Sequence, residues 1–173
     1  MRSDDLRAKQ APLKEHYKSE PSAALLTLKA QGRLGEGVTC SVQTGRALVE
    51  AGLHPATGGS GLSICSGDML LQALVACAGV TLKAVATALA ITVRDGKILA
   101  EGDLDFRGTL GVAKDVPVGF QRIRLSFELE TDASEEELAT LIRLTERYCV
   151  VYQTLQQSPE MVISTHAGMQ PIP

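Results

Sequence analysis

The chain has 173 residues and a formal net charge of −3 at pH 7. This length fits one domain, or one domain with a small appendage. Hydrophobic residues make up 45% of the chain, which is enough for a sizeable core, whereas aromatic residues make up only 3%. The slight acidity and the lack of a basic stripe argue against a nucleic-acid partner, and the few aromatic residues argue against base stacking.

The termini and the apolar segments bear on where the protein works. The N-terminal stretch "MRSDDLRAKQ" is charged rather than apolar, so we expect no signal peptide. The most apolar region, residues 69–90, contains Gln72, Thr81, Lys83 and Thr87. Because a span needs roughly 20 predominantly apolar residues, we expect no membrane partner. The sequence therefore predicts a soluble, cytoplasmic protein, in which four cysteines act as thiols or redox-active groups rather than as structural disulfides.

Residues 1–22 are rich in charge and contain two prolines. We expect a solvated arm with at most a short helix at 3–10 or 13–19, or, alternatively, an arm that packs on a partner subunit. Residues 23–173 are then expected to form the domain.

The first half of that domain combines short strands, a loop and a long helix. Short apolar alternations up to about residue 52 predict a meander of strands with turns at Gly32, Gly35, Gly37 and Gly45. The stretch "HPATGGSGLSICSG" is expected to be a loop. A helix at about 67–90 is apolar on nearly all sides, so it should be central. Ser66 is the expected N-cap, and Asp68 suits the positive end of the helix dipole.

The second half begins with two strands. Ile98, Ala100, Leu104 and Phe106 fall on one parity, which predicts a strand with one buried face. After a Gly- and Pro-bearing loop through residue 119, "FQRIRLSFELE" gives the clearest strand alternation in the chain.

Two helices and a last strand are expected after this pair. Ser134 and Glu137 form a capping box that opens a helix over 134–147. "CVVYQTL" is expected to start a second short helix, and "EMVIST" to form a final strand. The order of elements predicts an α+β fold in which an antiparallel sheet packs on helices.

The four cysteines are Cys40, Cys65, Cys77 and Cys149. None forms a CxxC pair, and the three histidines show no ligand spacing relative to them, so a zinc site has little support and we expect no metal or cofactor. Cys40 lies within a predicted strand and is interpreted as a packing residue.

The local surroundings of the other three cysteines differ in how far they favour a thiolate. Cys65 precedes the long helix, whose unpaired N–H groups would stabilise a thiolate, although an exposed loop thiol without a role is equally compatible. Cys77 lies in mid-helix among apolar residues, where burial alone raises a thiol pKa, unless a donor such as Thr81 reaches it. Cys149 lies where a new helical turn would favour its anion. The spacing alone leaves structural and reactive interpretations open for each cysteine.

The two segments that contain Cys77 and Cys149 carry a family resemblance. The boxes "LVACAGVTL" and "ERYCVVYQTL", in this order around a strand pair, resemble the two cysteine boxes of the OsmC/Ohr family. This family is named after osmotically inducible protein C and the organic hydroperoxide resistance proteins. The likeness extends over about residues 24–165.

The resemblance implies an OsmC-like α+β fold, in which antiparallel sheets pack on a long central helix and two subunits form an intertwined homodimer. It also implies a thiol peroxidase that reduces organic hydroperoxides, and hydrogen peroxide in some members. Cys77 would attack the peroxide and become a sulfenic acid, and Cys149 would resolve it as a disulfide. An external dithiol would then regenerate both thiols at an active site in the dimer interface.

Two departures from the family pattern bear on this activity. The family Glu ten residues before the first cysteine is replaced by Gly67, followed by Asp68. In a regular helix, Asp68 lies about 13 Å from Cys77 along the axis and on the opposite face, so it could help only across the two-fold axis or from a different helix start. The family Pro after the second cysteine is replaced by Val150.

The family also stabilises its thiolate with an Arg from the N-terminal strands. Arg33 and Arg46 are the candidates, with Arg46 preferred, and either could instead be a solvated turn residue. Two other functions stay open. One is a non-catalytic module that holds an apolar small molecule at the dimer cleft, and the other is a redox sensor in which Cys65 is an accessory or alternative thiol.

Overall fold

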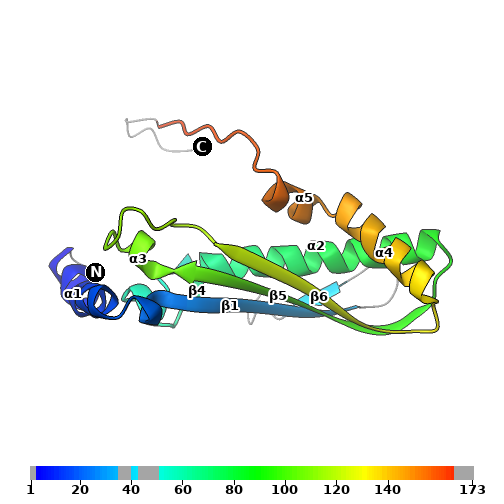
Figure 1. Ribbon diagram of the computed structural model, residues 1–173, viewed down its shortest axis with the longest axis horizontal. Coiled ribbons are helices and arrows are strands. Elements are labelled where there is room, and N and C mark those ends of the chain that lie inside the picture. The colour runs from blue at the N-terminus through cyan, green and yellow to red at the C-terminus, as the bar shows by residue number, and fades with distance from the viewer. Residues whose placement is uncertain (1–2, 35–39, 43–50, 166–173) are drawn as a thin grey trace, which may run out of the picture.

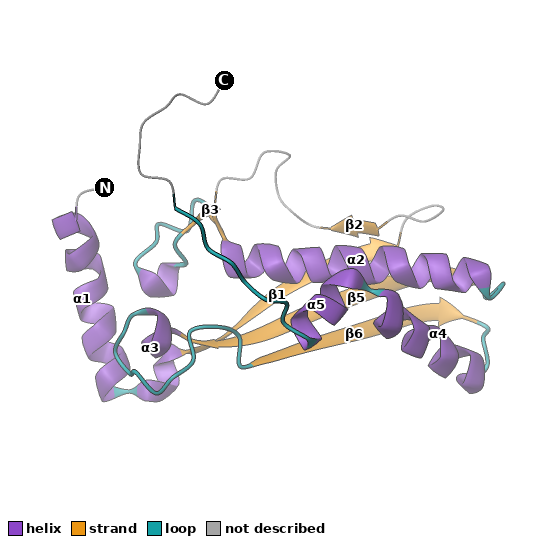
Figure 2. Cartoon of the chain, turned by 90° about the horizontal axis from the view of Figure 1, so that it is seen from above, coloured by secondary structure: helices purple, strands orange, loops and turns teal. Residues whose placement is uncertain are grey.

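The computed structural model describes residues 3–34, 40–42 and 51–165. A four-stranded antiparallel sheet, in the order β2-β1-β5-β6, carries one long helix on one face, as Figures 1 and 2 show. Its strands are β1 (Leu25–Leu34), β2 (Cys40–Val42), β5 (Val93–Asp105) and β6 (Arg122–Thr131). This arrangement confirms the predicted α+β class.

Short elements complete the first half of the chain. A small parallel pair joins β3 (Ala51–Gly52) to β4 (Ile64–Cys65) in a second sheet. The 3-10 turns η1 (Pro21–Ala24) and η2 (Pro55–Thr57) and the short helix α3 (Phe106–Thr109) lie in the connections. The loop expected before the long helix therefore contains one turn and one two-residue strand.

The two faces of the sheet differ in polarity, as the alternation predicts. On β5, the side chains of Ile98, Ala100 and Leu104 are buried on the face that packs on the long helix. The other face carries charge pairs: Arg124 donates from Nη2 to Asp103 Oδ1 at 3.0 Å, and Thr27 Oγ1 donates to the same oxygen at 2.7 Å. One face is thus core, and the other is polar and paired.

The long helix, α2 (Ser66–Ala88), is the centre of the core. Leu71, Leu74, Val75, Ala78 and Leu82 are all at most 1% exposed. These side chains pack on the sheet because a wide stripe of the α2 surface is apolar and meets the apolar face of the sheet. The N-cap is Cys65 rather than the expected Ser66, and the Cys65 side chain makes no capping hydrogen bond.

The described residues leave part of the other side of α2 exposed. Met69, Leu70 and Val80 are between 37% and 39% exposed. Of the helices in the described ranges, α2 alone is long and apolar enough to span a membrane, but 44% of its most apolar window is buried. The core helix of a soluble domain has the same character, and α2 takes that place here.

The N-terminal segment forms one continuous helix, α1 (Ser3–Ser19), where at most a short helix was expected. Pro12 lies inside it. Two bonds attach α1 to η2: Tyr17 Oη donates to the Ala56 carbonyl at 2.9 Å, and Gln10 Nε2 donates to the Thr57 carbonyl at 3.1 Å. Tyr17 is 4% exposed, so this helix contributes to the core. The division into an arm and a domain at residue 22 stays a prediction.

Two further helices follow β6. The first is α4 (Glu135–Tyr148), and the predicted capping box is confirmed: Ser134 Oγ accepts from the Glu137 amide at 3.3 Å, while the Glu137 carboxylate accepts from the Ser134 amide at 2.8 Å. The second is the predicted short helix, α5 (Val150–Gln156). Cys149 alone separates them, as the C-cap of α4 and the N-cap of α5.

Two sequence predictions about strands are wrong. Residues 160–165 do not form a strand in this chain, and Met161, Val162 and Ile163 are 80–89% exposed. Gly32 is not a turn residue, because it pairs with Ile98 inside β1, which makes β1 one ten-residue strand. The turns expected at Gly35, Gly37 and Gly45 lie outside the described residues.

Candidate active site

Two cysteines from distant segments meet beneath helix α5. Cys77 lies in the middle of α2 and is half-buried, while Cys149 precedes α5 and is 1% exposed. Because α4 and α5 both pack on α2, the short break at Cys149 directs its side chain towards Cys77. The two side chains are in hydrogen-bond contact, and both thiols are free.

The surroundings of Cys77 favour its anion. Burial would raise the pKa of the Cys77 thiol, but four donors outweigh this effect and the pKa lies below its ordinary value. The donors are the backbone amides of Val151 and Val150, the Cys149 thiol and the Thr81 hydroxyl. The two amides belong to the first turn of α5, where N–H groups have no helical partner.

The surroundings of Cys149 have the opposite effect. Burial, and then the neighbouring Cys77, raise the pKa of the Cys149 thiol to about 11, although the Tyr152 amide donates to its sulfur. Two neighbouring groups with pKa values pushed apart are suited to different roles. Cys77 is suited to attack a substrate as a thiolate, whereas Cys149 is suited to remain a neutral thiol.

A mostly apolar cavity of about 290 Å³ lies near the cysteine pair, although neither thiol lines it. Leu74, one helical turn before Cys77, lines it together with Tyr152 and Leu155 of α5. Phe120, just before β6, and Ile123 and Leu125, within β6, also line it, and the remaining lining residues are Gln121, Arg122 and Gln156. Most of these side chains, with Cys77 and Cys149, belong to one hydrophobic cluster, so the cavity is continuous with the packing around the thiols.

The glycine at position 102 shapes this lining. A Cβ atom on Gly102 would lie 2.4 Å from Cε1 of Phe120, so the Phe120 ring rests directly on the backbone of β5. The amide of Gln121 also donates to the carbonyl of Asp103 at 2.9 Å, which fixes the chain just before β6. Gly102 is therefore a position where a side chain would displace the cavity wall.

The other predicted acid and thiol lie at the start of α2. Asp68 is in the first turn of the helix, and its carboxyl group is not among the groups that contact Cys77. Burial raises the pKa of Asp68, and the nearby His54 opposes that rise. The Nδ1 atom of His54 accepts from the Ala56 amide at 3.1 Å. Cys65, the cap of this helix, is half-buried and free.

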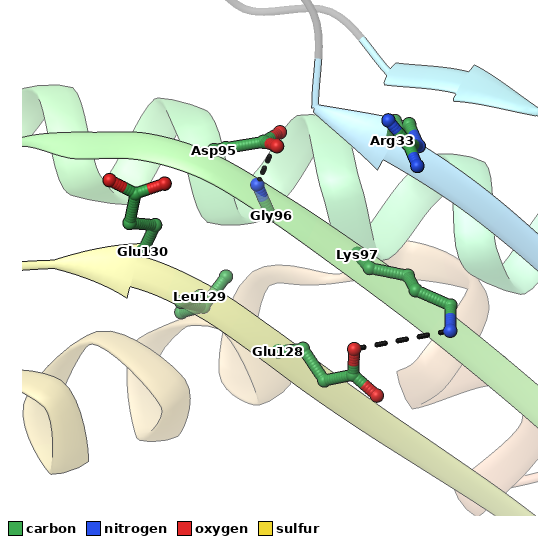
Figure 3. A pocket seen from close by; sticks show the side chains of 7 residues that line it. All are labelled: Arg33, Asp95, Gly96, Lys97, Glu128, Leu129 and Glu130. Carbon is green, nitrogen blue, oxygen red and sulfur yellow. Dashed lines mark hydrogen bonds and ion pairs between the residues drawn. The ribbon is translucent and has the colours of Figure 1, made fainter.

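The arginine candidates are not brought to Cys77 in the described part of the chain. Arg33 is exposed on β1, and it borders a polar cavity of about 390 Å³ with Asp95, Lys97 and Glu128, as Figure 3 shows. Lys97, its neighbour across the strands, belongs to the face of the sheet away from α2. Arg46 lies outside the described residues, and Cys40 is described only as the first residue of β2.

Sequence reasoning missed two of the four donors to Cys77. The amides of Val150 and Val151 carry no side-chain signature, but the predicted helix start after Cys149 was a signal that free N–H groups would gather there. It also missed the lining of the cavity, because Leu74, Phe120 and Tyr152 come from three separate segments.

The profile of the OsmC-like protein family matches residues 59–164, which is more than half of the chain. An OsmC-like hydroperoxide resistance protein from Jannaschia sp. CCS1 has a similar crystal structure, with a TM-score of 0.61, 17% sequence identity, and coverage of 85% of this chain and 97% of the other.

The OsmC-like protein from Mycoplasma pneumoniae is similar with a TM-score of 0.55 and 20% identity, over 78% of this chain and 86% of the other. None of the curated proteins matches the sequence significantly. The fold of the two solved structures agrees with the family match, and we conclude that this chain belongs to the OsmC-like family.

Proposed function

We propose that this protein is a thiol-dependent peroxidase that reduces organic hydroperoxides, and hydrogen peroxide as a smaller substrate, through Cys77 and Cys149. The observation that carries the proposal is the contact between these thiols, in which the pKa of Cys77 is lowered and that of Cys149 is raised. The nearby cavity, which is lined mostly by apolar side chains, supports an organic substrate. The hydroperoxide resistance protein among the similar structures agrees with this chemistry.

The reaction has two covalent steps. The Cys77 thiolate attacks the outer oxygen of the hydroperoxide, the O–O bond breaks, and the alkoxide takes a proton and leaves as an alcohol. Cys77 is then a sulfenic acid, which Cys149 attacks through its own sulfur. The disulfide forms, the hydroxyl group leaves as water with the thiol proton, and one peroxide has been reduced by two thiols.

A dithiol reductant then returns the pair to thiols by exchange through a mixed disulfide. A reducing cytoplasm, the compartment we propose for this protein, supplies such a reductant. Val150, at the family Pro position, leaves its amide free to donate to Cys77, and a proline could not do so. This replacement is therefore compatible with a stabilised thiolate.

The active unit is proposed to be a homodimer. The uncovered apolar side of α2, with Met69, Leu70 and Val80, is the face that a second subunit would cover. In that dimer, Arg46 would be the cation that supports the Cys77 thiolate, in addition to the donors described above.

The decisive experiment exposes the reduced protein to one equivalent of cumene hydroperoxide. We expect mass spectrometry to find a Cys77–Cys149 disulfide, and we expect Cys77→Ser to abolish peroxide consumption. Cys65→Ser, which changes a half-buried thiol outside the contact pair, is the matched control and should leave consumption unchanged.

Both thiols remaining free in excess hydroperoxide would reject the proposal. The protein would then be better explained as a non-catalytic module that holds an apolar molecule. Loss of oxidation in Cys65→Ser but not in Cys77→Ser would instead favour a sensor based on Cys65.

A further inference from the structure

The carbonyl oxygen of Glu146, in the last turn of α4, has a side chain as its partner. If α4 continued as a helix, this oxygen would accept from the backbone amide four residues on, which belongs to Val150. The chain breaks at Cys149 instead, whose φ of −72° and ψ of 105° are extended. The Val150 amide donates to Cys77, and Gln153 donates from Nε2 to the Glu146 oxygen at 2.8 Å.

Gln153 is bonded to both sides of the joint between α4 and α5. Its backbone amide donates to the Cys149 carbonyl at 2.9 Å, while its side chain holds the Glu146 carbonyl. Helix α5 has seven residues and no buried one. Because so short a helix is marginal on its own, its orientation depends on its bonds and contacts with α4 and α2.

A continuous helix is the competing arrangement of this joint. In it, the amides of Val150 and Val151 would donate to the carbonyls of Glu146 and Arg147. Both amides would then be withdrawn from Cys77, and the Val151 amide is the donor that lowers the pKa of that thiol most. The side chain of Gln153 disfavours this arrangement, because it satisfies the Glu146 carbonyl while the joint stays broken.

We propose that Gln153 is a positioning residue of the thiol site, which keeps the joint at Cys149 broken and so directs the first amides of α5 at Cys77. The proposal deepens the proposed function and rests on it for the effect on turnover. Gln153 is not among the groups that contact either sulfur, so it acts through the orientation of α5. A proline after Cys149 would block a continuous helix by its ring, and Gln153 takes over this part in a chain that has Val150.

The first experiment compares the reduced, full-length protein with its Gln153→Leu variant, which keeps the size and helix propensity of the side chain and removes the donor. Mass spectrometry follows the alkylation of Cys77 by iodoacetamide as a function of pH. Cys149 is the one titratable group among the causes that act on Cys77, and its pKa of about 11 keeps it protonated during the measurement. We expect the pKa of Cys77 to rise by about 0.5–1 unit in Gln153→Leu, so that alkylation near neutral pH slows about threefold to tenfold.

Val150→Pro distinguishes a positioning role from a general loss of packing. Proline cannot donate to the Glu146 carbonyl, and it favours an extended residue before it, which Cys149 already is. Added to Gln153→Leu, it should recover most of the lost alkylation rate, because the Val151 amide returns to Cys77. Val150→Pro alone should slow alkylation less than about twofold, since the Val150 amide is the weakest of the four donors.

Gln157→Leu is the matched control, because it makes the same change on an exposed side chain at the end of α5. It should leave the alkylation of Cys77 unchanged. The proposal would be overturned by an unchanged pKa of Cys77 in Gln153→Leu, by an equal rise in Gln157→Leu, or by a rise that persists after Val150→Pro is added.

The second experiment separates this proposal from the peroxidase itself. The kcat/KM for cumene hydroperoxide near neutral pH should fall about threefold to tenfold in Gln153→Leu and recover when Val150→Pro is added. Alkylation that responds as expected in a protein that reduces no peroxide would reject the peroxidase and leave the role of Gln153 standing. Peroxide reduction at the wild-type rate in Gln153→Leu, with an unchanged pKa of Cys77, would reject the role of Gln153 and leave the peroxidase standing.

Discussion

The middle of helix α2 and its N-cap present two thiols in contrasting surroundings. Cys65 caps a 23-residue helix, the position where a helix dipole favours a thiolate, yet its side chain makes no capping bond. Cys77 lies in the apolar middle, and three donors at the start of α5, together with Thr81 of α2 itself, lower the pKa of its thiol. This comparison shows that the pKa of Cys77 depends on the segment packed against α2, the start of α5, and not only on the position of the cysteine along the helix.

Removal of Cys149 is expected to have the largest effect on this contrast. In Cys149→Ser, the sulfenic acid formed at Cys77 has no resolving thiol, so it should persist and react with dimedone at close to one label per chain. The wild type and Cys65→Ser should form the disulfide and show almost no label. A disulfide between Cys77 and Cys65 in the variant would contradict the separation of Cys65, the N-cap of α2, from Cys77 in the middle of the helix.

Leu70 and Leu71 allow the same comparison between two neighbouring leucines of α2, one exposed and one buried. Leu71 is 0% exposed and Leu70 is 38% exposed. We expect Leu71→Ala to lower the free energy of unfolding by about 3 kcal/mol, because it leaves a cavity in the core. Leu70→Ala should cost less than about 1 kcal/mol in dilute, monomeric protein.

Urea denaturation across a range of protein concentrations measures both effects. If Leu70→Ala lowers the free energy of unfolding more at higher protein concentration, a partner covers that side of α2, which would sharpen the comparison. Equal costs for the two variants at every concentration would contradict the packing described here.

The Thr81 hydroxyl offers a finer test. Thr81→Val keeps the shape of the side chain and removes one donor to Cys77, so the pKa of the thiol should rise by about 0.5–1 unit. The reaction of Cys77 with peroxide needs the thiolate, so its rate profile should move to higher pH by the same amount. Thr87→Val is the control, because the Thr87 hydroxyl donates to the Lys83 carbonyl instead, at 2.8 Å. A profile that stays in place would show that the hydroxyl does not act on the thiolate.

The smallest effect is expected at Asp68. The carboxyl group is in the first turn of α2 and does not contact Cys77 in its own chain, so Asp68→Asn should change the rate of Cys77 oxidation by less than about twofold. Stopped-flow measurement of peroxide reduction provides the check. A loss of tenfold or more would mean that Asp68 of the partner subunit reaches the thiol.

The elements with strong periodicity could be predicted from the sequence. The alternation of β5 and β6 and the capping box of α4 depend on side chains that are close in the chain. The single helix α1 could not be predicted in this way, since Pro12 argues locally for a break, while its bonds to Ala56 and Thr57 come from a distant turn.

The candidate site was predicted in part. The resemblance of the two boxes identified Cys77 and Cys149, and helical spacing identified Thr81 as a neighbour of Cys77. Their electrostatics could not be predicted, because the donors at Val150 and Val151 come more than seventy residues later in the chain than Cys77. The cavity could not be predicted for the same reason, since Leu74, Phe120 and Tyr152 meet only after folding.

The one-residue joint between α4 and α5 has a consequence for how the state of the thiols is signalled. Val150 and Val151 begin α5 and also bind the sulfur of Cys77, so the anion itself helps to anchor that helix. If the proposed disulfide forms, Cys77 loses its negative charge and the first turn of α5 loses that partner. We therefore expect the orientation of α5 to differ between the reduced and the oxidised protein.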